Sequence, residues 1–272
     1  HLDQKYKDEI KWAFNQVRDK KVLPSMRSMQ FGGKAIEDNN LKQFNCAVRH
    51  VDSIRSFAEI TFSLLCGNGI GIGLSRKFLG RLPDLVNADD KNGTVITYVV
   101  QDDIQGWADS IEALLMCYFR NTAYSGRKIV FDYSKIRRKG SKLKTSGGKA
   151  PGYSPLKSAH TKIKALLDHI IEDLNVKRLG SVHAYDLLMH VADCVVSGGS
   201  RRSATAVIFE ATDSDMLAAK TFFTVEKYKG FEKDSETELY EGKVFVNNKW
   251  HSVEKVYEYD YNQIINESKI SW

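Results

Sequence analysis

The sequence predicts an α/β protein with a largely parallel sheet. About five apolar, strand-like segments alternate along the chain with five or six segments of helical periodicity. Glycine-rich and basic loops stand at the ends of these segments, where such folds place ligands. The chain has 272 residues, which is enough for one large domain or two small ones.

Composition limits the classes of function. The chain is 42% hydrophobic and 27% charged, as is typical of soluble proteins, and no run approaches the ~18 apolar residues of a membrane span. The formal charge of +6 is mild and spread out, so it suits small anionic ligands no less than nucleic acid. Four cysteines lie far apart without metal-ligand spacing, so we expect no metal site and reduced thiols, as in a cytoplasmic protein.

Helices are expected where apolar residues recur three and four positions apart. These segments are 3–20, 53–66, 102–120, 154–174 and 181–196. Gly67 stands where a helix usually ends in a left-handed glycine. We expect 24–33 to be irregular, 34–43 to form a loop, a short helix to begin at Asp213, and 222–262 to contain strands.

Strands are expected at 44–48, in the run 67–75, at 94–100 and 128–133, and after the two arginines of the stretch 195–209. The first is interpreted as a buried strand with Cys46 in its middle. In the second, glycine alternates with isoleucine, which weakens a strand unless something must approach its backbone. Both a ligand and tight packing remain open as reasons. A helix precedes these glycines, whereas a dinucleotide fingerprint opens a helix after a strand, so we reject a dinucleotide-binding fold.

Two further segments have the composition of anion-binding loops. Segment 134–152 is the densest basic stretch, and it suits a phosphate cradle or a solvated surface; few aromatic residues are interleaved, which argues against nucleic acid. Segment 195–209 runs from an apolar helix through Gly198 and Gly199 to two arginines and then a strand. Glycines allow a sharp turn and arginine forks suit phosphate or a carbonyl edge, although a plain turn with solvated arginines remains an alternative.

Five ordered motifs resemble those of ribonucleotide reductases. They are Asn45-Cys46-Ala47, the run 67–75, and the segments 131–137, 145–152 and 197–204. In detail they are similar to the adenosylcobalamin-dependent class II enzymes, and most similar to the monomeric ribonucleoside-triphosphate reductase type. The helix around Gly106-Trp107-Ala108 also matches. The resemblance covers roughly residues 24–221.

The resemblance implies a fold of which this chain is one part. It implies an N-terminal helical segment (1–43), the first half of a ten-stranded α/β barrel with its nucleotide-binding loops (44–221), and a strand-like insertion (222–272). The family's Asn-Pro-Cys-Gly-Glu motif, which holds the radical cysteine and the acid/base glutamate, does not occur in the sequence. We therefore expect an N-terminal fragment, with a missing C-terminal half that supplies the partner cysteine and the main cobalamin contacts.

Site residues follow from the same resemblance. Cys46 matches one member of the redox pair that reduces the substrate radical at the 2′ carbon and ends as a disulfide, whereas the other cysteines, Cys66, Cys117 and Cys194, match no catalytic position and are expected to be structural. The substrate's sugar is expected near Asn45, Asn68 and Gly69. A deoxynucleoside triphosphate effector is expected at Asp132, Arg137, Lys144, Gly147, Gly148 and Lys149. The specificity loop between effector and substrate base is Gly198, Gly199, Ser200, Arg201 and Arg202.

The implied activity is reduction of ribonucleotides to 2′-deoxyribonucleotides for DNA synthesis. It uses adenosylcobalamin and a thioredoxin-like or dithiol reductant under allosteric control, in the cytoplasm and with no membrane or nucleic-acid partner. Two alternatives stay open, the large chain of a class I reductase and a non-catalytic nucleotide-binding fragment. Arg202-Ser203 after Gly-Gly-x-Arg favours the cobalamin class.

Overall fold

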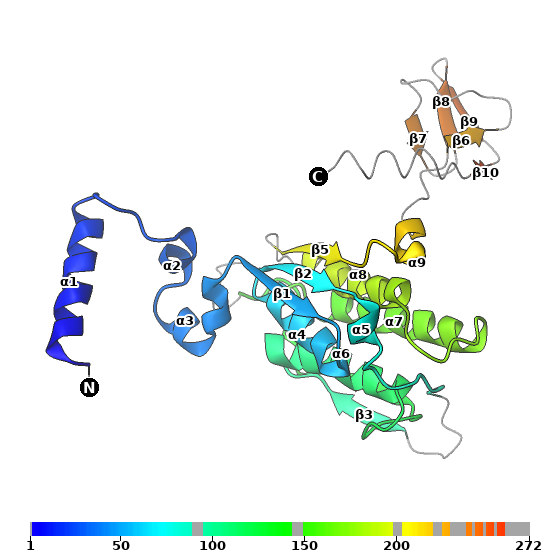
Figure 1. The fold of residues 1–272 in the computed structure, drawn as a ribbon, viewed down its shortest axis with the longest axis horizontal. Helices are drawn as coiled ribbons and strands as arrows, with labels where there is room; N and C mark the ends of the chain where they lie inside the picture. The colour runs from blue at the N-terminus through cyan, green and yellow to red at the C-terminus, as the bar shows by residue number, and fades with distance from the viewer. Residues whose placement is uncertain are drawn as a thin grey trace. The chain divides into compact units, whose positions relative to one another are not determined.

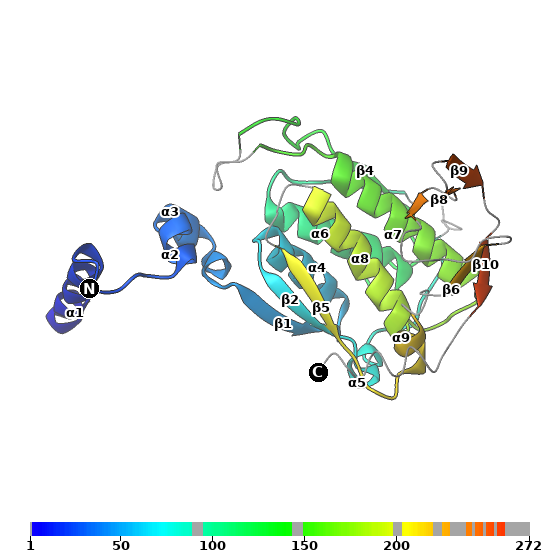
Figure 2. The same cartoon turned by 90° about the horizontal axis from the view of Figure 1, so that it is seen from above.

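The computed structural model describes residues 2–88, 95–142, 149–197 and 203–219, and beyond them the backbone of five short strands. The chain divides into two compact units, 1–209 and 210–272. The first unit contains every described site residue, and Figures 1 and 2 show its elements. No helix in the described residues is long and apolar enough to cross a membrane.

The main sheet of the first unit is parallel, as predicted. Its order is β1 (Cys46–His50), β2 (Gly69–Gly73) and β5 (Ala204–Ile208), with β2 in the middle. A second parallel pair joins β3 (Ile96–Val99) to β4 (Ile129–Asp132). Helix α4 (Ile54–Leu65) connects β1 to β2, and α6 (Ile104–Tyr118) connects β3 to β4, so each pair forms a βαβ unit.

Helices cover one face of the main sheet (Figures 1 and 2). Helix α4 packs on β1 and β2, α8 (Ser181–Ser197) packs on β5, and α6 and α7 (Ser154–Glu172) pack behind them. The core between the sheet and α4 contains fully buried aliphatic side chains, namely Ile60, Leu64, Ile70, Ile72 and Leu74. Each such side chain contributes about 1.5–3 kcal/mol through removal of apolar surface from water.

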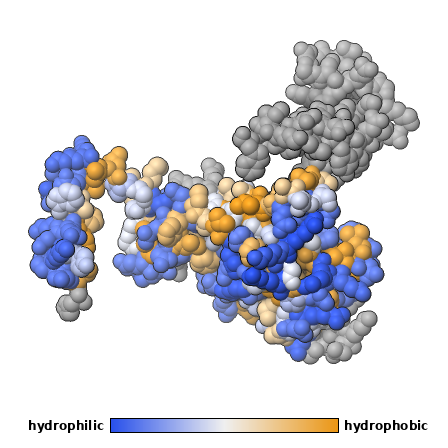
Figure 3. All heavy atoms as spheres, viewed as in Figure 1, coloured by the Kyte–Doolittle hydropathy of each residue, from blue (hydrophilic) through white to orange (hydrophobic). Residues whose placement is uncertain are grey.

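The opposite face of this sheet is exposed among the described residues of the unit. Its side chains alternate with the buried ones, as the period of two requires, and they include Val48 and Ile208, which are 65% and 54% exposed. Figure 3 shows hydrophobic residues gathered over these strands. Between them lie Gly71 and Gly73; a Cβ on Gly73 would stand 2.1 Å from His50 Nδ1, and one on Gly71 would stand 3.2 Å from Val48. At these two positions the reason for glycine is therefore the packing of neighbouring side chains across the sheet.

Helix ends follow local chemistry. Gly67 adopts φ +81°, and its amide donates to Leu64 O, so α4 ends as the sequence predicts. Asp103 caps α6 by accepting a hydrogen bond from Gly106 N at 2.6 Å. The predicted helix 3–20 is α1 (Gln4–Arg18), which contains no buried residue.

Two predictions for the region between α1 and β1 are wrong. Residues 24–33 contain helix α2 (Met26–Phe31), and residues 34–43 contain α3 (Lys34–Asp38) and a 3-10 turn, η1 (Asn40–Gln43). Ser25 caps α2 by accepting from Ser28 N, and α2 buries Arg27 and Phe31. Short helices of this kind have too few turns to show a period in sequence, and their stability comes from such tertiary contacts.

The short helix α5 (Arg76–Leu79) follows β2 in the first unit, and the remaining elements belong to the second unit. They are the short helix α9 (Ser214–Ala218), which Asp213 caps through Met216 N, and two small antiparallel sheets. One sheet pairs β6 (Val225–Tyr228) with β10 (Lys255–Glu258). The other has the order β7 (Glu238–Tyr240), β8 (Lys243–Val246) and β9 (Lys249–Ser252). The predicted helix start at Asp213 and the strand-like character of 222–262 are confirmed.

Candidate nucleotide and thiol site

Parallel pairing brings the starts of three strands together. Cys46, Gly69 and Ala204 are register partners, and each is the first residue of its strand. Asn45 and Asn68 directly precede two of these residues, and segment 198–202, which lies outside the described residues, leads through Ser203 into the third. The predicted thiol and substrate residues thus converge at the amino ends of the strands, not at the carboxyl ends where we expected ligands.

Cys46 is exposed, which corrects the prediction of a buried strand around it. The strand begins at Cys46 rather than at Phe44. Its first, third and fifth residues, Cys46, Val48 and His50, face away from the helices. A Cβ on Gly69 would lie 3.8 Å from Cys46 Sγ. Glycine stands next to the thiol on β2, and alanine follows at the same level on β5, so small residues continue across the sheet from Cys46.

The other three cysteines are buried, and their environment makes them poor nucleophiles. Burial raises the pKa of the Cys117 thiol and that of the Cys194 thiol to about 12. Burial also raises the pKa of Cys66, whose sulfur accepts from Asn39 Nδ2 at 3.0 Å. A thiol that stays protonated reacts slowly, so these side chains act in packing, as the sequence predicted.

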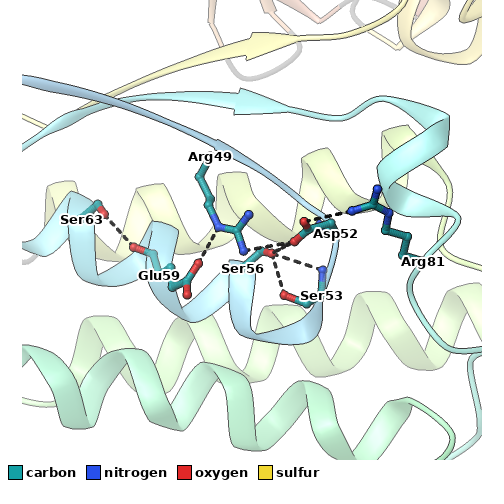
Figure 4. A network of polar contacts seen from close by, with 7 residues as sticks. All are labelled: Arg49, Asp52, Ser53, Ser56, Glu59, Ser63 and Arg81. Atoms are coloured by element: carbon teal, nitrogen blue, oxygen red, sulfur yellow. Dashed lines mark hydrogen bonds and ion pairs between the residues drawn. The ribbon is translucent and has the colours of Figure 1, made fainter.

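A polar network on the helix side of the sheet fixes β1 on α4 (Figure 4). Arg49 points to the side of β1 opposite Cys46, and its guanidinium contacts Glu59 of α4 at 2.5 Å and Asp52 at 3.1 Å. Ser56 donates to Asp52 and accepts from the backbone amides of Asp52 and Ser53. The strand that presents the thiol is thereby tied to the first turns of the helix that follows it.

Arg27 is a site residue that the sequence analysis missed. Its side chain is 6% exposed, its Nε donates to Asn45 Oδ1 at 2.7 Å, and its Nη2 donates to Gly67 O at 2.5 Å. Asn45 O in turn accepts from Gly69 N at 2.8 Å. One buried cation therefore holds the backbone before β2 and the asparagine before β1. No pattern in the sequence distinguishes this arginine from a solvated one.

The Asn68 side chain is fully buried, and its amide nitrogen binds backbone carbonyls. Its Nδ2 donates to Phe44 O at 2.6 Å and to Leu41 O at 3.3 Å, which fastens η1 against the start of β1. Its Oδ1 has no hydrogen-bond partner in the described part of the chain. Of the three residues predicted near the substrate's sugar, Asn45 and Gly69 border Cys46 directly, whereas the Asn68 side chain supports the turn behind them.

The predicted effector residues follow β4. Asp132 Oδ1 accepts from Ser134 N at 2.8 Å, and this backbone hydrogen bond lowers the pKa of Asp132. Arg137 does not project freely, because its Nε pairs with Asp102 Oδ2 at 2.7 Å and its backbone amide donates to Asp102 Oδ1 at 3.1 Å. Lys149 is exposed and pairs with Lys142 in an antiparallel bridge. Lys144, Gly147 and Gly148 lie outside the described residues, as does the specificity loop 198–202.

Comparisons with known proteins show what this chain is similar to. The family model for the insertion domain of B12-dependent ribonucleotide reductase matches residues 83–167. This region contains β3, α6, β4 and most of α7. The fold is similar to the crystal structure of a B-12 dependent (class II) ribonucleotide reductase, with a TM-score of 0.68 and 21% identity over 80% of this chain and 36% of that one. The resemblance to the adenosylcobalamin-dependent class of ribonucleotide reductases is thus confirmed.

Curated relatives carry the name of one type within that class. The chain is 28% identical over 233 residues to the adenosylcobalamin-dependent ribonucleoside-triphosphate reductase of Euglena gracilis, covering 82% of this chain and 30% of that protein. It is 29% identical over 230 residues to a probable enzyme of that name from Dictyostelium discoideum, covering 77% of this chain and 29% of that protein. The chain therefore spans about a third of the length of the relatives it matches.

Proposed function

We propose that this chain is the nucleotide-binding and thiol-bearing part of an adenosylcobalamin-dependent ribonucleoside-triphosphate reductase. The observation that supports this best is the exposed Cys46 at the start of β1, in register with Gly69 and Ala204 and bordered by Asn45. The main sheet and its helices would form the first half of the ten-stranded barrel, and Cys46 would be one thiol of the pair that reduces the 2′ carbon.

One pocket among the described residues does not fit the cobalamin. It is lined by Leu41, Arg55, Ala58, Glu59, Phe62, Ser63 and Gln105, and ion pairs occupy its polar side, since Arg55 contacts Glu112 and Asp109. A corrin ring needs a broad apolar surface, which this pocket lacks. We therefore derive no step through the cofactor from the described residues. What they supply is the reducing thiol, the floor beneath the substrate and the effector segment.

The effector site is proposed at the end of β4. Asp132 lies just before the segment 134–152, and the exposed Lys149 lies near its end. A carboxylate whose orientation is fixed by a hydrogen bond suits a hydroxyl of the effector's sugar, whereas ammonium groups suit phosphates. The specificity loop 198–202 would join this region to the substrate, because its sequence leads directly to the strand beside β2.

The test is an assay of the complete protein that contains this chain. Incubation with ribonucleoside triphosphate, a dithiol and adenosylcobalamin should yield deoxynucleotide, and deoxynucleoside triphosphates should change which base is reduced. Activity that needs a separate metal-containing radical subunit instead of adenosylcobalamin would assign the chain to the class I type. Nucleotide binding with no reduction under either condition would assign it to a non-catalytic protein.

A further inference from the structure

A chain of polar groups, half-buried at Tyr133 and fully buried at His160 and Ser110, connects the residue after β4 to α7 and α6. His160 on α7 is 3% exposed, Tyr133 Oη lies 2.8 Å from its Nδ1, and Ser110 Oγ on α6 lies 3.0 Å from its Nε2. The imidazole also stacks on Phe131 of β4, with ring centroids 3.9 Å apart. Three elements distant in sequence therefore meet at one side chain.

The direction of these hydrogen bonds is set by Ser110. Its hydroxyl lies 2.7 Å from Trp107 O, and because a carbonyl oxygen only accepts, the hydroxyl proton must point there. Ser110 Oγ then accepts from His160 Nε2–H, which leaves Nδ1 without a proton, so Nδ1 accepts from the Tyr133 hydroxyl. The neutral Nε2–H tautomer thus satisfies every member of the chain, as a buried polar network must.

Tyr133 stands at the base of the basic segment. It directly follows Asp132, its carbonyl accepts from Ile136 N at 3.0 Å, and its ring stacks on Tyr153 with centroids 5.5 Å apart. Tyr153 directly follows the segment, so the two tyrosines hold together the residues where 134–152 leaves and rejoins the core. Further along the segment, Gly140 N donates to Ala150 O and Ala150 N donates to Ser141 O. These backbone hydrogen bonds join the first part of the segment to its last part.

We propose that Tyr133, His160 and Ser110 form a positioning chain that fixes the base of segment 134–152 on α6 and α7, so that binding of a nucleotide's phosphates there depends on the Tyr133 hydroxyl. These residues touch no ligand themselves. They hold Asp132 and the two sides of the segment in one arrangement before the ligand arrives, which reduces the ordering cost of binding. The ligand is the deoxynucleoside triphosphate of the proposed function, on which this inference rests.

The test compares Tyr133→Phe with Tyr98→Phe in this chain. The first variant keeps the ring stack and loses the hydroxyl that contacts His160, whereas Tyr98 contributes a ring contact with Phe131 and is the matched loss of a hydroxyl from the neighbouring strand. Trypsin cleavage at the exposed Arg138 and Lys139 should become about two- to tenfold faster in Tyr133→Phe, the factor expected when one hydrogen bond is lost. Tyr98→Phe should be cleaved at the rate of the unmodified chain.

The coupling between Tyr133 and His160, measured as the cleavage rate of the double variant, distinguishes a positioning chain from two independent structural roles. If the two side chains act through one contact, His160→Phe should accelerate the same cleavages, and Tyr133→Phe combined with His160→Phe should add little to either single change. Additive effects, or equal cleavage of Tyr133→Phe and Tyr98→Phe, would overturn the positioning chain. If His160→Phe does not fold, the comparison of Tyr133→Phe with Tyr98→Phe still tests the positioning chain.

Binding of dGTP and dATP to the same proteins separates this inference from the proposed function. The expected result is a dissociation constant about two- to tenfold higher for Tyr133→Phe and unchanged for Tyr98→Phe. If the unmodified chain binds neither nucleotide, the proposed effector site fails while the cleavage comparison still tests the positioning chain. If both nucleotides bind and Tyr133→Phe leaves their affinity unchanged, the positioning role in binding is refuted.

Discussion

Stability at mildly acidic pH should depend on His160. Burial lowers the pKa of this imidazole to about 3, from an ordinary value of 6.5. Tyr133 is a titratable group that contacts His160. Burial raises the pKa of Tyr133, and the nearby Cys194 raises it further. Between pH 3 and 6.5 the unfolded chain therefore binds a proton at this position that the folded chain does not bind.

The sign and size follow from proton linkage. Because the unfolded state binds more protons, the free energy of unfolding rises with pH in this window, and His160 stabilises the fold fully only above pH 6.5. The slope is about 1.4 kcal/mol per pH unit for one proton, so lowering the pH from 7 to 5 should cost about 2 kcal/mol through this residue. That loss is a large part of the stability of an ordinary domain.

The assay is urea unfolding at pH 7, 6 and 5 for the unmodified chain and for His160→Gln, followed by far-ultraviolet circular dichroism. Glutamine can accept from Tyr133 and donate to Ser110 without titrating, and every other histidine remains in both proteins. The unmodified chain should lose about 2 kcal/mol more than the variant between pH 7 and 5. Parallel stability curves for the two proteins would show that His160 titrates normally and would refute the reasoning.

Three further predictions concern the site. Arg27→Ala leaves Asn45 Oδ1 and Gly67 O without their buried donor, so the free energy of unfolding should fall by about 2–4 kcal/mol in urea titrations, whereas the exposed Arg18→Ala should change it by less than about 0.5 kcal/mol. Lys149→Ala should weaken nucleotide binding in calorimetry and leave stability unchanged; Arg137→Ala should lower both, because it also breaks the pair with Asp102, and equal stability of the two variants would contradict this. The isolated chain should form no deoxynucleotide with adenosylcobalamin and dithiol, since the radical-cysteine motif does not occur in it, and any product above background would contradict that dependence.

The sequence predicted the elements whose stability is local or periodic. Helices α4 and α6 show strong three- and four-residue spacing with capping residues before them, and the glycine after α4 marks its end. The parallel arrangement followed from the alternation of strands and helices. Such features can be predicted from the sequence because each depends on residues a few positions apart.

Features that depend on distant contacts could not be predicted. Helix α2 is stabilised when Arg27 reaches Asn45, 18 residues later, and His160 has partners 27 and 50 residues away. Whether Cys46 is buried depends on which face of β1 the helices cover, which a five-residue strand does not reveal. Arg137 was expected at the effector site because its segment resembles the family's effector region, and the resemblance did not reveal that an ion pair with Asp102 already engages it. The ranges proposed for the barrel half and the insertion stay predictions.

The central claim is that Cys46 reduces the substrate. The direct measurement is the yield of deoxynucleotide and of free base from the complete protein with ribonucleoside triphosphate, adenosylcobalamin and dithiol, in Cys46→Ser and in the buried control Cys66→Ser. A serine hydroxyl cannot supply the sulfur-bound hydrogen or form the disulfide, so Cys46→Ser should bind nucleotide, release base and form no deoxynucleotide, while Cys66→Ser should still reduce its substrate. Normal dithiol-driven deoxynucleotide formation by Cys46→Ser would remove this thiol from the reaction and contradict the account.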